Sequence, residues 1–152
     1  SEVTLFRHFQ SKRGLFDETL RSRLRPYDAL EYLTNGVTYD LSVDLMHIAR
    51  AMLETYRQNA PLLRMVMRDK IRGSMPEKAV QRNERTAEQA LLTYFTAMKE
   101  AGRISAEPEM ALRLCTINIT GYFFRELFGH ADSHDDGYFT WMLEKLIGAL
   151  TA

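Results

Sequence analysis

Apolar residues recur every three or four positions along most of the chain, which is the period of an amphipathic helix. The clearest case follows Asp40, which can cap a helix whose apolar positions share one face. That inner face comprises Leu41, Leu45, Ile48, Ala49, Met52, Leu53 and Tyr56. No run alternates in the manner of a strand for more than a few residues. The pattern therefore predicts an all-α fold.

Prolines, glycines and capping residues divide the pattern into successive helices. Ser11 can cap the first of them, Pro61 is expected to interrupt the helix that follows Asp40, and Pro108 fits the first turn of a later one. The expected helices span residues 12–25, 41–60, 62–73, 75–101, 108–129, and from 135 or 136 to the C-terminus.

The last two expected helices are apolar on more than one face. A surface helix of a monomer needs only one buried stripe, so two stripes indicate two partners. We therefore expect a homodimer joined by a four-helix bundle, rather than the alternative in which both helices are central to one subunit. The expected interface residues are Ala111, Leu114, Ile117, Gly121, Phe124, Phe128, Phe139, Met142, Leu143, Leu146, Ile147 and Leu150. A second stripe on the first of these helices consists of Leu112, Cys115, Ile119, Tyr122 and Phe123, and the pattern does not tell which face meets the dimer partner and which the core.

Composition adds a charge asymmetry to this picture. The 152 residues are 45% apolar with a net charge of zero, but residues 1–25 hold six Lys or Arg and three acids, a net of +3. The positive end is typical of a segment that meets an anion, although three charges alone decide little. No apolar run reaches the length of about 18 residues that a membrane span needs. The single cysteine fits a reducing cytoplasm, so we expect a cytoplasmic protein with no membrane partner.

The first twenty residues carry a specific pattern: Thr4-Leu-Phe-Arg-His-Phe9, then Ser11-Lys12 and Leu15. This resembles the TetR (tetracycline-repressor) family of transcriptional regulators, whose DNA-binding domain ends in Thr-Leu-Tyr-x-His-Phe-x-Ser-Lys-x-x-Leu. The resemblance implies that residues 1–25 are the C-terminal remnant of a helix-turn-helix domain whose first two helices are absent. Residues 26–152 would then form the ligand-binding and dimerisation domain.

The resemblance also implies DNA contacts. The residues concerned are Glu2, Val3, Thr4, Phe6, Arg7, His8 and Lys12. In this assignment Glu2 and Val3 lie near the start of the recognition helix, where base edges are read. Thr4, Arg7, His8 and Lys12 would lie near phosphates. Phe6 departs from the family pattern because it lacks the tyrosine hydroxyl, so we expect it to pack instead.

The family's effector pocket lies within the helical body, and this chain offers a plausible lining there. The expected ligand-binding residues are Met46, Arg50, Leu53, Met67, Tyr94, Phe95, Met98, Cys115, Asn118, Ile119 and Tyr122. Such a lining favours a largely apolar ligand oriented by one or two polar groups. Each apolar member also fits ordinary core packing. Asn118 could bond across the dimer axis, bond to a ligand, or face water at a helix edge.

Other chemistry is weakly indicated. The segment 130–136, HADSHDD, could hold a metal but also fits a polar interhelical loop. Cys115 lies in an apolar setting, which favours an inert thiol. We therefore expect no catalytic residues, metal or cofactor. The function predicted is a ligand-responsive repressor that binds a palindromic DNA operator as a homodimer and is released by a small effector. The alternatives are a helical-bundle enzyme or carrier of a hydrophobic molecule, or a plain helical dimerisation module.

Overall fold

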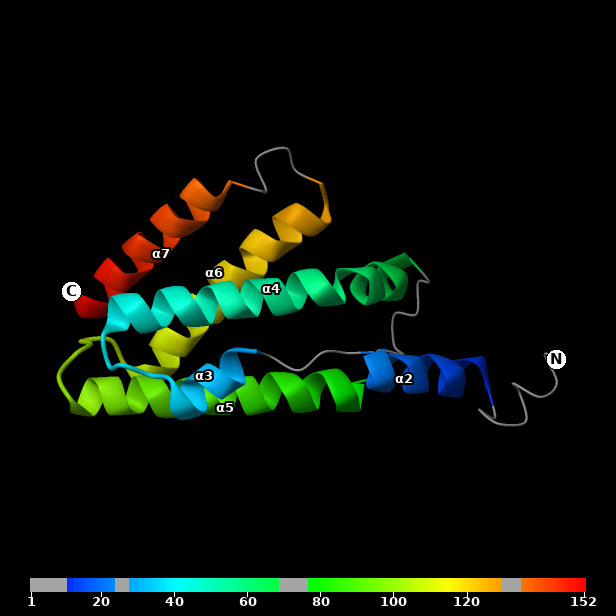
Figure 1. Cartoon of the computed structure of the whole chain (residues 1–152), viewed down its shortest axis with the longest axis horizontal. Coiled ribbons are helices and arrows are strands. Elements are labelled where there is room, and N and C mark those ends of the chain that lie inside the picture. Colours follow the sequence, from blue (N-terminus) through cyan, green and yellow to red (C-terminus); the bar gives the residue numbers. More distant parts are fainter. Residues whose placement is uncertain (1–10, 24–27, 69–76, 130–134) are drawn as a thin grey trace.

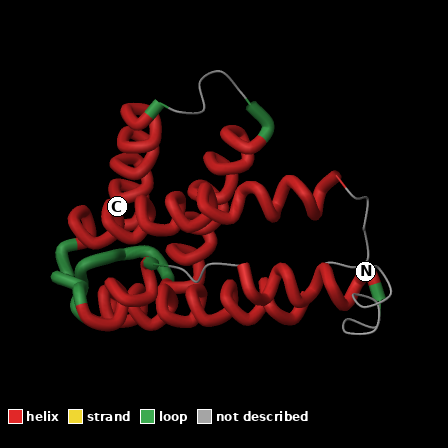
Figure 2. Tube along the Cα trace, turned by 45° about the vertical axis from the view of Figure 1, so that its right-hand side comes forward, coloured by secondary structure: helices red, strands yellow, loops and turns green. Residues whose placement is uncertain are grey.

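A computed structural model describes the backbone of residues 11–23, 28–68, 77–129 and 135–152, which consists of helices joined by short connections (Figure 2). These residues contain no strand, so the all-α prediction is confirmed for them. The helices are α2 (Lys12–Arg23), α3 (Ala29–Asn35), α4 (Leu41–Arg68), α5 (Glu77–Glu100), α6 (Pro108–Leu127) and α7 (Asp136–Thr151).

The helix boundaries follow local chemistry. Asp135 caps α7 by accepting hydrogen bonds from the backbone amides of Gly137 and Tyr138. Pro108 occupies the first turn of α6, where its missing amide costs nothing. Gly102 follows the end of α5 with a φ of +67°, a left-handed conformation that glycine adopts without a steric penalty. These three boundaries lie where the sequence predicted them, within about one residue.

The predicted break at Pro61 is wrong. Helix α4 runs through this proline without a second start, to Arg68. Pro61 is exposed, so its ring points away from the core. Its neighbours Ala60 and Leu63 pack against the core on the other face. Because this burial continues across the proline, it outweighs the loss of one backbone hydrogen bond.

Helix α6 lies at the centre of the assembly, packed against α4, α5 and α7. Figure 1 shows it crossing behind α4 toward its hairpin partner α7. Helix α3 packs against α4 and α5, which run antiparallel, near the start of α4 and the C-terminal half of α5. The predicted inner face of α4 is buried from Leu41 to Leu53, with Tyr56 partly buried at its edge. On α6 the stripe that contains Cys115 and Ile119 belongs to this core, which decides a point that the sequence left open.

The faces of α6 and α7 differ from the expected arrangement. On α6, the stripe formed by Leu114, Ile117, Gly121, Phe124 and Phe128 is exposed, whereas Ala111 is fully buried. On α7, the expected interface residues lie in or against the subunit's own core, and they are Phe139, Met142, Leu143, Leu146, Ile147 and Leu150. The reason is that α7 has one apolar stripe along its length, which the core occupies, while α6 has two.

Within the described part of the chain, no helix combines the length and the apolar character that crossing a membrane would require.

Candidate functional site

A cavity of about 420 Å³ lies between α4, α5 and α6. Its lining residues are Met52 and Tyr56 from α4, Ala87, Glu88 and Leu91 from α5, and Thr116, Ile117, Thr120, Gly121 and Phe124 from α6. The deep wall is buried, at Met52 and Leu91, whereas Ile117 and Phe124 are exposed at the rim. The volume falls in the range of small-molecule sites. The cavity can therefore hold a small organic ligand beside the exposed stripe of α6.

Few polar groups line this cavity. The hydroxyls of Tyr56 and Thr120 lie 3.2 Å apart and form a hydrogen bond between α4 and α6. The Thr116 hydroxyl donates to the carbonyl of Leu112, one turn back on its own helix. Glu88 contributes an exposed carboxylate from α5. A mostly apolar wall with a few oriented polar groups is the usual composition of a ligand pocket.

None of the expected ligand-binding residues whose side chains the structure describes lines this cavity. Seven of them are buried in the core cluster, and they are Leu53, Tyr94, Phe95, Met98, Cys115, Ile119 and Tyr122. Met46 is partly buried against the same core. The side chain of Met67 lies outside the described residues. Burial raises the pKa of the Cys115 thiol to about 12, which keeps it protonated and unreactive.

The polar members of the expected set have other partners. Arg50 is exposed and its Nη2 lies 3.4 Å from the Thr140 hydroxyl of α7. The Asn118 amide donates to the carbonyl of Leu114 at 2.7 Å, within α6. The Tyr122 hydroxyl donates to the carbonyl of Asp135. The structure therefore distributes these residues over several contacts, and their role in ligand binding stays a prediction.

A second polar feature is the buried carboxylate of Asp44, in the first turn of α4. Its Oδ1 accepts hydrogen bonds from the Tyr32 hydroxyl of α3 at 2.7 Å and from the backbone and hydroxyl of Thr38. Its Oδ2 accepts from the backbone of Tyr39 at 2.8 Å and from the Tyr94 hydroxyl of α5 at 3.0 Å. We call these five residues the Asp44 cluster. It fastens α3, α4, α5 and the connecting loop together.

The Asp44 cluster is electrostatically consistent. Burial acts to raise the pKa of Asp44, but the hydrogen bonds from Thr38, Tyr32 and Tyr94 outweigh it and hold the pKa below 3.8. Burial and the neighbouring carboxylate raise the pKa of Tyr32 to about 12, and they also raise that of Tyr94. Tyr39 adopts a left-handed φ of 61°, which is unfavourable for a tyrosine, and its bond to Asp44 holds it there.

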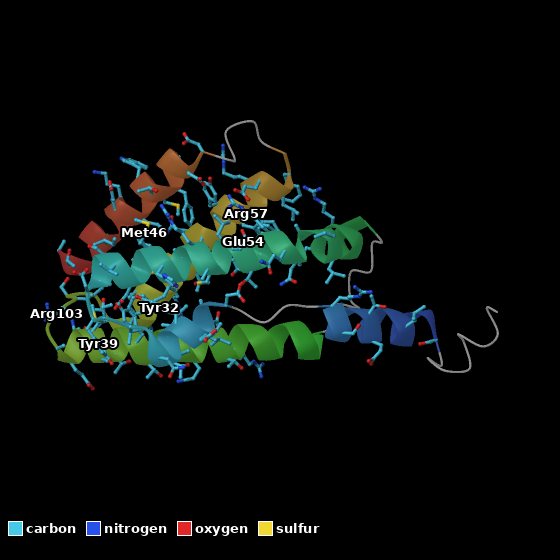
Figure 3. All side chains as sticks on the ribbon, viewed as in Figure 1. Tyr32, Tyr39, Met46, Glu54, Arg57 and Arg103 are labelled. Carbon is cyan, nitrogen blue, oxygen red and sulfur yellow. The ribbon has the colours of Figure 1, made fainter. Side chains whose placement is uncertain are left out.

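An ion pair links α4 to α6 beyond the cavity. Arg57 contacts both carboxylate oxygens of Glu126, through Nε at 2.9 Å and Nη2 at 2.5 Å. The Glu126 side chain is 5% exposed and that of Arg57 is 35% exposed. The hydrogen bonds that Arg57 donates to the Glu126 carboxylate raise the pKa of Arg57 above its ordinary value. Figure 3 labels Arg57 on the α6 side of α4, and Tyr32 and Tyr39 toward the other end of the bundle.

The exposed stripe of α6 holds five of the nine large hydrophobic residues that are exposed in the described part of the chain. Its exposed fractions are 54% at Met110, 37% at Leu114, 70% at Ile117, 39% at Phe124 and 61% at Phe128. Together with Gly121, these positions follow alternating steps of four and three residues, which is the spacing of a seam between paired helices. The spacing reads the same in both directions along α6, so it suits a two-fold contact.

Two groups of expected site residues fall outside what the structure describes. The DNA-contact residues from Glu2 to His8 lie in the segment 1–10, and Lys12 belongs to α2 but its side chain is not among those described. Most of the 130–136 loop also lies outside the described residues. Among the residues that are described, no group of His, Cys, Asp or Glu has the arrangement of a metal site.

The sequence analysis missed the polar lining of the cavity. Thr116 and Thr120 are four residues apart in an otherwise apolar helix, so they share a face. That pair could have indicated a polar strip at the edge of the core. Glu88 gave no such signal, because it is one of several charged residues on α5.

Comparison with known proteins provides one informative relative. The chain is 30% identical over 129 residues to the uncharacterized HTH-type transcriptional regulator YvkB of Bacillus subtilis (strain 168). The matched region covers 84% of this chain and 66% of the relative, just under two thirds of its length. No protein-family model and no solved structure matches the chain. The likeness supports a transcriptional regulator of the helix-turn-helix type and favours that class over an enzyme.

Proposed function

We propose that the chain is the sensor part of a TetR-type, ligand-responsive repressor in the cytoplasm. The observation that carries the proposal is the likeness to a helix-turn-helix regulator over most of the chain. The motif in residues 4–15 and the net charge of +3 in residues 1–25 support DNA binding by the N-terminal part. Residues 26–152 act as the ligand-binding and dimerisation domain, and a palindromic operator would be bound by the dimer.

The exposed stripe of α6 is the proposed dimer contact. Its heptad-like spacing and the exposure of its side chains among the described residues support this assignment. Ile117→Glu would place a charge at the centre of the contact and should shift the protein to monomer in sedimentation velocity. Val43→Glu, at another exposed apolar residue on α4, is the matched control and should leave the dimer intact.

The cavity between α4, α5 and α6 is the proposed effector site. A ligand there would touch Tyr56 and Thr120, whose hydrogen bond joins α4 to α6. It can change DNA affinity only if it binds the two arrangements of these helices with different affinity. Because α4 carries the Asp44 cluster at its other end, a shift of α4 would reach α3, the first helix of the described body after α2.

DNA binding by the full-length protein tests the proposal directly. Selection from a random duplex library should enrich a two-fold symmetric motif with half-sites about 34 to 36 Å apart. The affinity for it should fall steeply, by about 10³-fold or more, between 50 and 200 mM salt. Arg7→Ala should lower this salt dependence, while Arg103→Ala, an exposed arginine beyond the end of α5, should not. A salt-insensitive protein with no enriched motif would rule out the repressor.

A further inference from the structure

The one full charge on the described wall of the cavity is negative. Among its described lining residues Glu88 is the only ionisable side chain besides the Tyr56 phenol, and no Lys, Arg or His lines it. Of the cations near it whose side chains the structure describes, none is a lining residue. Arg85 and Arg113, each three residues before a lining residue, are exposed and do not border the cavity. Arg57, next to Tyr56, is held by Glu126. A ligand in the cavity therefore meets one full negative charge and no positive one from the described wall.

The hydroxyls of the wall also favour donors over acceptors in the ligand. The Thr116 proton is directed at the Leu112 carbonyl, and one proton of the Tyr56 and Thr120 pair lies between those two oxygens. These three hydroxyls therefore offer a ligand their oxygen lone pairs and at most one remaining O–H, that of the accepting partner in the Tyr56 and Thr120 pair. An anionic ligand would need donors, which the wall supplies poorly. A cationic or donor-bearing ligand would find acceptors.

Two aromatic rings also line the cavity. Tyr56 contributes from the buried side and Phe124 from the rim, on opposite helices. Faces of aromatic rings attract cations, most strongly where water is excluded. The aliphatic residues Met52, Leu91 and Ile117 supply apolar contact for the rest of a ligand. Carboxylate, ring faces and apolar wall together match an organic cation with a large apolar body.

We propose that this cavity binds lipophilic organic cations and that Glu88 selects their charge. The proposal deepens the effector site proposed above, but it concerns binding alone and does not require DNA. The probes are tetraphenylphosphonium and tetraphenylborate, which have nearly the same shape and opposite charge. Titration calorimetry on the wild-type chain should show binding of the phosphonium at least tenfold tighter than that of the borate. Equal or tighter borate binding, or no phosphonium binding, would overturn the proposal.

Glu88→Gln tests the charge selection, because it keeps the size of the side chain and removes its charge. Phosphonium affinity should fall about fivefold to tenfold, and borate affinity should stay the same or rise. Glu100→Gln is the matched control, since Glu100 is exposed on the same helix and does not line the cavity. An unchanged preference in Glu88→Gln would show that Glu88 does not select charge.

Gly121→Leu tests the location. A side chain at Gly121 meets no atom within 4 Å where its Cβ would lie, so the subunit can accept it, and the added leucine would fill the mouth of the cavity. Gly148→Leu is the control, because Gly148 is equally open on α7 and away from the cavity. Phosphonium binding should be lost only in the first variant. Circular dichroism reports folding in both, and sedimentation velocity reports whether Gly121→Leu, which also lies on the proposed dimer contact, has changed the oligomeric state. Retained binding in Gly121→Leu would place the probe elsewhere. Loss of cation binding with intact operator binding would leave the repressor proposal standing.

Discussion

Asp44 and Tyr56 lie about three turns apart on α4, and their surroundings differ in kind. Asp44 is fully buried and accepts five hydrogen bonds, which come from α3, from α5 and from the loop between α3 and α4. Tyr56 is half-buried beside a cavity, and its hydroxyl meets one hydroxyl of α6. One end of α4 is therefore fixed by many polar contacts, while its middle borders space that a ligand can occupy.

This difference suggests how the two regions divide the work of a sensor. Polar clusters that are fully satisfied resist small displacements, because every hydrogen bond must be kept at once. A ligand acting at Tyr56 would then tilt α4 as a unit, with the Asp44 cluster carrying α3 along. The predictions below test whether the two regions really differ in this way.

The largest expected effect is the loss of the Asp44 carboxylate. Asp44→Asn should lower the free energy of unfolding by about 3 to 5 kcal/mol. The backbone amides of Thr38 and Tyr39 donate to different oxygens of the carboxylate, and an asparagine side chain has only one acceptor oxygen. Asp40→Asn is the control in the same loop. Asp40 caps α4 through the amides of Ser42 and Val43, and asparagine caps equally well. Urea denaturation of both variants measures the difference, and equal midpoints would refute a special role for Asp44.

The Arg57–Glu126 pair is expected to matter less. Glu126→Gln should cost about 2 kcal/mol, below the 3 to 5 kcal/mol of a fully buried pair, because water reaches Arg57. Glu54→Gln, on the exposed side of α4, should change stability by less than about 0.5 kcal/mol. The same denaturation curves report both. A cost equal to that of Asp44→Asn would mean that the cavity region is fastened as firmly as the Asp44 cluster.

The pH dependence of stability should come from the Asp44 cluster. The pKa of Asp44 is below its ordinary value in the folded state, so its contribution is present above about pH 4 and is lost as the pH falls further. The pKa of Tyr32 is raised to about 12, so stability should also fall as the pH rises from 10 to 12. Because Tyr32 is partly exposed, we expect a loss on the order of 1 kcal/mol. Denaturation midpoints across pH should lose part of the alkaline slope in Tyr32→Phe and the acid slope in Asp44→Asn.

The sequence predicted the parts of the fold that depend on neighbours along the chain. The inner face of α4, the cap at Asp135 and the stop at Gly102 all follow from local periodicity and backbone chemistry. Pro61 was misjudged because a local rule was overridden by packing on the far side of α4. The apolar stripe of α7 was recognised, but periodicity cannot say whether such a stripe meets its own core or another subunit.

The cavity and the Asp44 cluster depend on three helices at once. An aspartate in the first turn of a helix usually faces solvent near the positive end of the dipole, so nothing local marks Asp44 as buried. The cavity exists where α4 and α5 meet α6 without filling the space between them, and that fit involves residues from 52 to 124. The expected lining set failed to find it because those residues are large and apolar, and such residues fill space rather than leave it.

The smallest expected effect concerns Gly121, which borders both the cavity and the exposed stripe of α6. Alanine is a better helix former than glycine, and a Cβ at Gly121 meets no atom within 4 Å. Gly121→Ala should therefore stabilise the isolated subunit by up to about 1 kcal/mol, and Gly148→Ala on α7 should do the same. Thermal melting at low protein concentration should show equal gains. At high concentration the gain at Gly121 should shrink if α6 pairs closely with α6 of a second copy, because the added methyl would separate the helices. If the gain at Gly121 stays equal to that at Gly148 at all concentrations, then α6 does not pair closely with a second copy at this residue. The spacing of the stripe would then be the remaining support for the dimer.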